Sequence, residues 1–232
     1  MSRGIPSSLI AVSLSVVAAA CGEEEPSEDG EYYPMSVGDY WVYEETGVYG
    51  GDATELRYEV TGAGTVELDY VGGTRDVFEV ENTFPGTSDE RRLQYIADDG
   101  TRAARVRHEI YDESGDLTKV REFDPGFLRF DRSRTGEGDE WTEDIEMHND
   151  FVDGSEVEAQ SLQYRFEVID RSREVTVPAG TFDCLVLKRS EVFGTVGEVK
   201  VYYLAPGVGK VKEITENDKE EDLVEYHVGG DQ

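Results

Sequence analysis

The sequence has few basic residues, only two cysteines and no long apolar run. Its 22 lysines and arginines stand against 52 acidic residues, which gives a formal net charge of −30. Nucleic acids and anionic lipid surfaces reward clustered lysine and arginine, so this charge argues against both as partners of the protein surface. The longest apolar stretch, Leu9 to Ala20, is shorter than the ~20 residues that a membrane span needs.

Motifs of catalysis and metal binding are also missing. His108, His148 and His227 each stand apart from any second histidine or cysteine at metal-ligand spacing, and the sequence has no G-x-S-x-G, P-loop or dinucleotide fingerprint. We therefore expect no enzyme and no catalytic, cofactor or metal site. A hydrolase assembled from distant residues stays open as an alternative.

Three acidic segments offer oxygen ligands of the kind that calcium prefers. They are residues 112–116, 150–156 and 217–222. None has the ordered ligand positions of an EF-hand loop. We interpret them as exposed turns.

The N-terminus has the layout of a secretory signal. Arg3 is the only charge before Cys21, and the apolar stretch ends in three alanines. Val17 to Gly22 resembles a bacterial lipobox. The resemblance implies that residues 1–20 are a lipoprotein signal peptide and that Cys21 is acylated on its thiol and new amino group. A soluble-export signal in which Cys21 is incidental is the alternative.

Lipidation of Cys21 would decide where the protein resides. A diacylglyceryl group and an amide-linked acyl chain such as palmitate supply the two hydrophobic signals that stable anchoring requires. The membrane is then a partner through these acyl chains. Gly22 follows the cysteine where aspartate would favour the inner membrane, so the resemblance implies the outer membrane of the cell envelope, facing the periplasm or the cell surface.

Composition divides the rest of the chain into two parts. Residues 21–31 combine the lipidated cysteine with an acidic spacer without apolar residues, and residues 32–232 form a single all-β domain. Cys184 is the only thiol in that domain, so no intrachain disulfide can stabilise it. We expect Cys184 to be a buried hydrophobe rather than a nucleophile.

Hydrophobic residues recur with a period of two along most of the domain. Leu56, Tyr58 and Val60 alternate with polar residues, as do the apolar residues of 162–168. This alternation predicts half-buried antiparallel strands. Turn signals separate the runs at residues 61–64, 71–74, 98–101 and 113–116. The fold class is therefore all-β, a long antiparallel meander of about a dozen strands that forms a curved half-barrel, a barrel or a sandwich.

Large aromatic residues are the candidates for the interior of this sheet. They form either a solid core or the wall of a concave apolar cavity for a lipid or acyl chain. The candidates are Trp41, Tyr43, Tyr58, Tyr70, Phe78, Tyr95, Phe130, Trp141, Tyr164 and Phe166.

The few basic residues gather in the middle of the chain. Residues 91–134 contain ten basic and nine acidic side chains. Strand alternation predicts that Arg105 and Arg107 share one face, and Arg129, Arg132 and Arg134 follow. These arginines form either an anion-binding face or cross-strand pairs with the surplus carboxylates; sheets favour the second arrangement.

Two strand–turn–strand segments carry a resemblance. The segments Val177–Phe182 (VPAGTF) and Tyr202–Lys212 (YYLAPGVGKVK), with the opening Tyr33–Tyr43, resemble a group of uncharacterised bacterial envelope lipoproteins. Some members look like the half-barrels of lipoprotein carriers, although no amphipathic helix is available here to act as their lid. The resemblance implies a non-catalytic binding or structural module that meets an unknown protein or apolar ligand. The alternative is a carrier or chaperone for a lipid or acylated ligand.

The anchor can be tested directly. Cys21→Ala removes the thiol that the diacylglyceryl group would modify, so we expect radiolabelled palmitate incorporation to be lost and the protein to move to the soluble fraction. Labelling that persisted in Cys21→Ala would contradict the assignment. Cys184→Ala is the control and should leave labelling unchanged.

Overall fold

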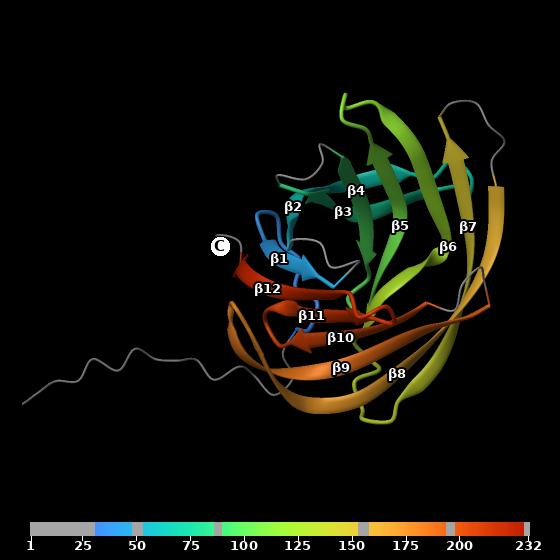
Figure 1. Cartoon of the computed structure of the whole chain (residues 1–232). Helices are drawn as coiled ribbons and strands as arrows, with labels where there is room; N and C mark the ends of the chain where they lie inside the picture. The colour runs from blue at the N-terminus through green and yellow to red at the C-terminus, as the bar shows by residue number, and fades with distance from the viewer. Residues whose placement is uncertain (1–30, 48–52, 86–89, 153–157, 194–197, 230–232) are drawn as a thin grey trace, which may run out of the picture.

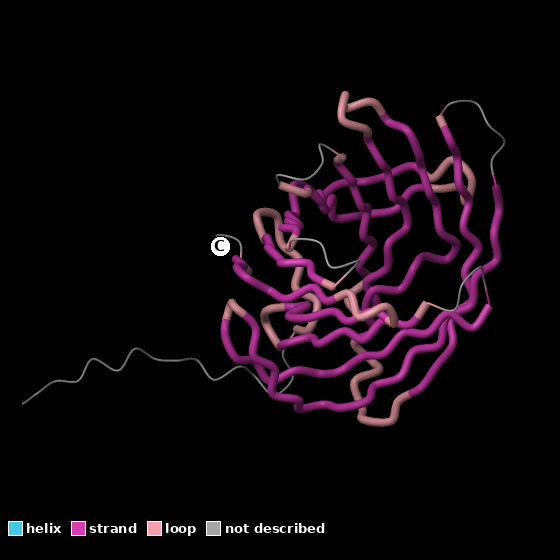
Figure 2. The backbone as a smooth tube through the Cα atoms, viewed as in Figure 1, coloured by secondary structure: helices cyan, strands magenta, loops and turns pink. Residues whose placement is uncertain are grey.

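The chain folds into a closed antiparallel barrel of twelve strands, described by a computed structural model over residues 31–47, 53–85, 90–152, 158–193 and 198–229. Each strand pairs with its neighbours in the sequence, and β12 pairs with β1 to close the sheet (Figures 1 and 2). The predicted meander is confirmed, and a barrel is the form it takes. The strands are β1 (Tyr40–Thr46), β2 (Thr54–Glu67), β3 (Thr74–Thr83), β4 (Arg91–Asp98), β5 (Arg102–Tyr111), β6 (Leu117–Asp131), β7 (Glu140–Phe151), β8 (Glu158–Val177), β9 (Gly180–Phe193), β10 (Val199–Ala205), β11 (Gly209–Thr215) and β12 (Glu220–His227).

Alternation places one set of side chains inside the barrel. Leu56 and Val60 of β2 are buried inside, whereas Glu55, which precedes Leu56, is exposed. The predicted turns at 71–74, 98–101 and 113–116 join consecutive strands, and Pro178-Ala179 joins β8 to β9. The predicted turn at 61–64 is wrong, because β2 continues through it with a bulge between Val60 and Gly62. No helix among the described residues is long and apolar enough to cross a bilayer.

The segment before β1 covers one end of the barrel, which we call the closed end. Tyr33 and Met35 pack against the interior clusters, and the ring of Tyr32 lies 5.8 Å from that of Phe130. The backbone oxygen of Glu31 accepts a hydrogen bond from the β10–β11 turn. The odd-numbered strands end at the opposite end, which we call the rim.

Apolar side chains fill most of the closed half of the barrel. Phe123, Phe130, Phe166 and Leu185 are almost completely buried there. Cys184 is fully buried as predicted, and burial together with Asp183 raises the pKa of its thiol to about 12. Most of the aromatic residues expected inside lie in these clusters.

Two of the aromatic predictions are wrong. Tyr70 lies beyond the end of β2 and stacks on His148 outside the barrel. Tyr95 belongs to a small cluster with Val106, because the register of β4 and β5 shifts between Tyr95 and Ile96. Strand alternation holds only as far as the next turn or bulge, and both residues stand beyond one.

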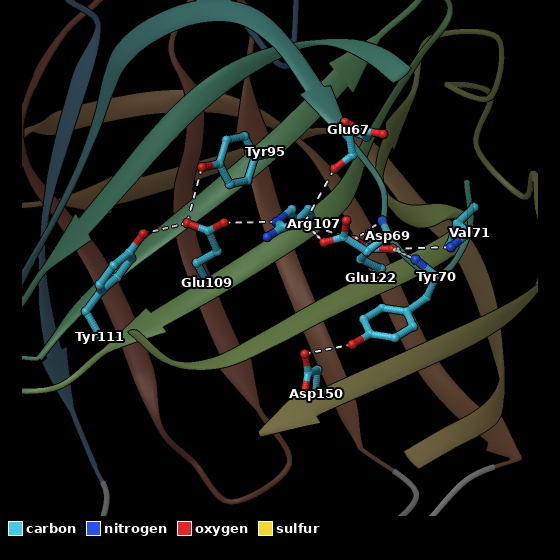
Figure 3. A network of polar contacts seen from close by, with 10 residues as sticks. All are labelled: Glu67, Asp69, Tyr70, Val71, Tyr95, Arg107, Glu109, Tyr111, Glu122 and Asp150. Carbon is cyan, nitrogen blue, oxygen red and sulfur yellow. Dashed lines mark hydrogen bonds and ion pairs between the residues drawn. The ribbon is translucent and has the colours of Figure 1, made fainter. Parts of the chain in front are cut away.

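The tip of the β2–β3 hairpin reaches across to β6. Glu122 of β6 is fully buried, and its carboxylate accepts hydrogen bonds from the backbone N–H groups of Asp69, Tyr70 and Val71 at 2.8, 2.8 and 3.2 Å. Arg107 lies 3.0 Å from the same carboxylate, and Figure 3 shows how this guanidinium also meets Glu109 and Asp69. One buried carboxylate therefore holds the hairpin tip to the barrel wall.

This attachment generates a stability prediction. Glu122→Gln removes the charge and one acceptor oxygen, leaving buried N–H donors unpaired at a cost of about 2–3 kcal/mol. Urea unfolding should detect the loss, and hydrogen exchange at residues 68–73 should become faster. Glu55→Gln, an exposed change on β2, is the matched control and should alter the free energy of unfolding by less than about 0.5 kcal/mol.

Candidate functional site

The half of the barrel nearer the rim contains a cavity of about 390 Å³. Pockets for small ligands typically have volumes of ~300–1,000 Å³. The cavity is lined by many polar side chains, and it extends to the strand ends at the rim, where Glu45 and Arg92 lie. Seven basic and five acidic residues line it: Arg92, Arg105, Arg121, Arg129, Arg189, Lys200 and Lys219, with Glu45, Glu191, Glu198, Glu213 and Glu221.

On the β10–β12 side of the cavity, the charges neutralise one another. Glu213 lies 2.7 Å from Lys200 and 3.1 Å from Lys210, and Lys210 also lies 2.5 Å from Glu221. Although burial opposes both shifts, this pairing raises the pKa of Lys210 and lowers the pKa of Glu213, so both stay charged. Two further pairs line the same side, Lys219–Glu45 and Arg189–Glu198.

On the β4–β6 side, cations outnumber their partners. Arg105 has no ion pair with any described carboxylate; its Nη1 donates to Gln94 Oε1 at 3.3 Å, and its Nε is buried without a hydrogen-bond partner among the described residues. Its guanidinium lies 4.8 Å from the ring centre of Phe123 and 5.0 Å from that of Phe127. Burial, and then the nearby arginines, lower the pKa of Arg105 to about 9, as expected for an uncompensated cation.

A polar row crosses the same wall. Gln94, His108, Arg121 and Asn149 are direct cross-strand partners on β4, β5, β6 and β7. Asn149 Oδ1 accepts from Arg121 Nε at 3.1 Å, whereas both ring nitrogens of His108 are buried without a partner among the described residues. Burial, followed by the surrounding arginines, lowers the pKa of His108 to about 2. The imidazole is therefore neutral at physiological pH and has one N–H to donate.

An irregularity in the sheet creates this arrangement. Arg105 pairs with Phe127 and Arg107 with Glu122, so four residues of β6 lie opposite Val106 alone. Gly126 makes the close approach possible, since a Cβ there would lie 3.0 Å from that of Ala104 at a backbone φ of +146°. Bulges of this kind re-aim side chains and are frequent beside functional sites.

The structure separates the arginines that the sequence grouped. Arg105 and Arg129 line the cavity, but Arg107 lies outside it in the network of Figure 3. The bulge between Arg105 and Arg107 reverses the alternation that would place both on one face. Arg132, one residue past the end of β6, pairs with the carboxylates of Glu31 and Asp98, so it meets acidic partners as expected, although not across two neighbouring strands. Arg134 lies over Trp141. Some of these arginines therefore line a cavity that could bind an anion, and others pair with the surplus carboxylates.

Several cavity residues escaped the sequence analysis. The sequence patterns do not single out Arg121 or Arg189, and they indicate His108 only as a candidate for metal binding or hydrolysis. Strand alternation offered a signal for one of them, because Arg189 follows the buried Leu185 and Leu187 at a spacing of two. A basic residue in phase with a buried apolar run indicates an inward-facing charge.

The other candidate residues lie apart from the cavity or outside the described residues. His148 stacks on Tyr70, and His227 stacks on Tyr40. Within the described ranges, no three histidine, cysteine or acidic side chains converge to hold a metal. Asp112 caps its own turn by accepting two backbone hydrogen bonds. Cys21 and part of the acidic segment 150–156 fall outside the described residues.

Together these features define a twelve-stranded meander barrel with a charged internal cavity, and two solved structures resemble it. One is a candidate exported protein with a YmcC-like fold from Bacteroides fragilis, at TM-score 0.51 and 14% identity over 85% of this chain and 99% of that one. The other is a candidate lipoprotein from Parabacteroides distasonis, at TM-score 0.42 and 15% identity over the same shares. The first likeness shows a common fold. No protein-family profile and no curated protein matches the sequence.

The buried histidine predicts a pH dependence of stability. His108 takes up a proton in the unfolded chain near pH 6.5 but resists it in the native barrel until about pH 2. The unfolded state thus binds more protons in this window, so stability falls as pH falls. Between pH 7 and 5 the loss is about 2 kcal/mol. In urea unfolding, the free energy of unfolding of His108→Gln should lack this decrease between pH 7 and 5. His227→Gln, a change at an exposed histidine, should show the same decrease as the wild type.

Proposed function

We propose that the protein is a non-catalytic binding module of the bacterial cell envelope that holds a small ligand inside its barrel. In this proposal acyl chains on Cys21 anchor it, at the outer membrane. The observation that carries the proposal is the cavity of about 390 Å³, which extends to the rim and is lined by inward-facing polar groups. A purely structural barrel has no need to keep charged side chains around an internal space, because burying them costs free energy.

The lining of the cavity favours binding over catalysis. His108, the histidine in the cavity, lies among arginines, and no described carboxylate accepts a hydrogen bond from it. A hydrolytic triad requires a histidine positioned by an acidic group and within reach of a nucleophile. The pKa of His108 is also far too low for a general base at neutral pH.

The lining also favours a small polar ligand over a long acyl chain. The more apolar pocket, between Tyr33, Met35 and Trp41 at the closed end, has a volume of only about 90 Å³. The larger cavity is crossed by arginines and glutamates, which a long hydrocarbon chain would leave without partners. The carrier alternative therefore has less support than the binding module.

The described part of the chain enters the barrel at its closed end, opposite the rim. Glu31 packs at the closed end and follows Cys21 by ten positions, a distance that an extended chain spans in at most about 35 Å. The export signal in the sequence and the exported character attributed to the Bacteroides fragilis protein support an envelope location. The closed end would face the membrane, and the rim would open away from it.

A pair of adjacent substitutions tests the proposal. Met147 lines the cavity and Glu146 is its exposed neighbour on β7. Met147→Trp fills the cavity, so organic extraction and mass spectrometry of the purified protein should recover a stoichiometric small molecule from the wild type and much less from this variant. Glu146→Trp should retain the wild-type amount. Equal contents in the wild type and Met147→Trp would contradict a ligand site in the barrel.

A further inference from the structure

The charge inside the barrel is opposite in character to the charge of the whole chain. The protein carries a net charge of −30, yet the cavity lining has seven cations and five anions. On the side of the cavity formed by β1 and β9–β12, acidic lining residues meet a lysine or Arg189; these residues are Glu45, Glu198, Glu213 and Glu221. The opposite wall, formed by β4 to β6, has cations in excess.

Arg105 stands at the centre of this excess. Arg121, Arg129 and Arg189 all lie close enough to repel its charge, and no described carboxylate offsets that repulsion. Within the described part of the chain, the Arg105 side chain donates a hydrogen bond to Gln94 Oε1 at 3.3 Å, and the amide of Gln94 in turn donates to Asn82 at 2.9 Å. Phe123 and Phe127 supply ring faces, which offset part of the cost of a buried cation but cannot neutralise it.

His108 adds an unused donor beside the arginines. Only 5% of its surface is exposed, and neither ring nitrogen has a hydrogen-bond partner among the described residues. A buried polar group without a partner costs about 1–3 kcal/mol. A ligand that accepts hydrogen bonds would remove this cost at His108 and at the free Nε–H of Arg105 simultaneously.

We propose that Arg105, Arg121 and His108 bind the oxyanion group of a small organic anion, with the apolar part of that anion against Phe123, Phe127 and Leu162. This proposal rests on the proposed ligand-binding function and names the chemical class of the ligand. Guanidinium groups match carboxylate, phosphate and sulfate groups through paired N–H donors. Phe123, Phe127 and Leu162 line the same cavity and present the apolar surface that the remainder of the ligand would cover.

Two arrangements in the sheet support a built site. Arg121 is held in place by Asn149, and Gln94 is held by Asn82, so the polar row is fixed by side chains that face the same cavity wall. The bulge at Val106 turns Arg105 inward while Arg107 two positions later stays outside. In regular alternation Arg105 and Arg107 would share a face, and Arg105 and His108 could not both point into the cavity.

Titration calorimetry can test the ligand class with defined probes. The probes are octanoate, its neutral analogue octanamide, and inorganic phosphate, and the protein is the full chain carrying Cys21→Ala. We expect octanoate to bind and octanamide to bind at least tenfold more weakly. Phosphate binding as tightly as octanoate would identify a free oxyanion as the ligand, whereas tighter binding of octanoate would identify an organic anion with an apolar part.

Charge variants should separate recognition from folding. Arg105→Gln and Arg121→Gln should each weaken octanoate binding by about tenfold to a hundredfold, without changing octanamide binding. The matched control Arg57→Gln removes a half-buried positive charge from a β2 residue that does not line the cavity, and it should leave both affinities unchanged. The thermal midpoint of unliganded Arg105→Gln should not fall, because the substitution relieves repulsion among buried cations; a purely structural arginine would give a marked decrease.

The outcomes distinguish the two proposals. Equal affinities for octanoate and octanamide, unaffected by Arg105→Gln, would overturn anion recognition while leaving a ligand site in the barrel. Failure of all three probes to bind would also overturn it. A binding-module function fails separately, through equal small-molecule contents in the wild type and Met147→Trp.

Discussion

The pairing of β1 with β12 is the interaction on which the rest of the molecule depends. It joins Tyr40 to His227 and Thr46 to Glu220, so the two ends of the described barrel meet at one seam. Without this seam the sheet would have two unpaired edge strands and would not enclose an interior. Closure instead creates an interior. Eight strands enclose a space that side chains just fill, so a twelve-stranded barrel has more internal volume than its wall alone can occupy.

The two halves of the barrel deal with this volume differently. At the closed end, large aromatic side chains and the segment from Glu31 to Met35 fill the interior, and Tyr33 contributes to both apolar clusters. Towards the rim, arginines, glutamates and amides replace the apolar residues, and the space between them remains open. The apolar half supplies the stability that comes from burial, and the polar half contains the cavity in which we propose that a ligand binds.

Sequence patterns predicted the architecture better than they predicted the cavity. The alternation of apolar and polar residues in β2 and β8 can be recognised within each strand by itself. The turn residues between strands can likewise be recognised from a few neighbouring positions. Closure of the sheet depends on residues 187 positions apart, Tyr40 and His227, which no local pattern connects. The cavity wall depends on the bulge beside Val106. An extra residue reverses every side chain beyond it, so the faces of Arg105 and Arg107 could not be assigned without the register.

The clustered arginines also show what a count of charges leaves out. The sequence places cations near one another in the middle of the chain, but their role depends on which of them find carboxylates. Arg107 and Arg132 find them outside the cavity, and Arg189 finds one within it. Arg105 does not, because its direct cross-strand partners are the apolar Ile96 on β4 and Phe127 on β6, and the side chain that it meets is the amide of Gln94.

The acidic exterior has a consequence for the rate at which any charged molecule enters the barrel. A net charge of −30 repels anions over distances comparable to the Debye length, which is ~10 Å at 0.1 M salt. An anion bound for the arginines therefore approaches against the long-range field and is attracted only after it has passed the rim. Added salt screens the outer field more than the buried one, so it speeds entry, the reverse of ordinary electrostatic steering.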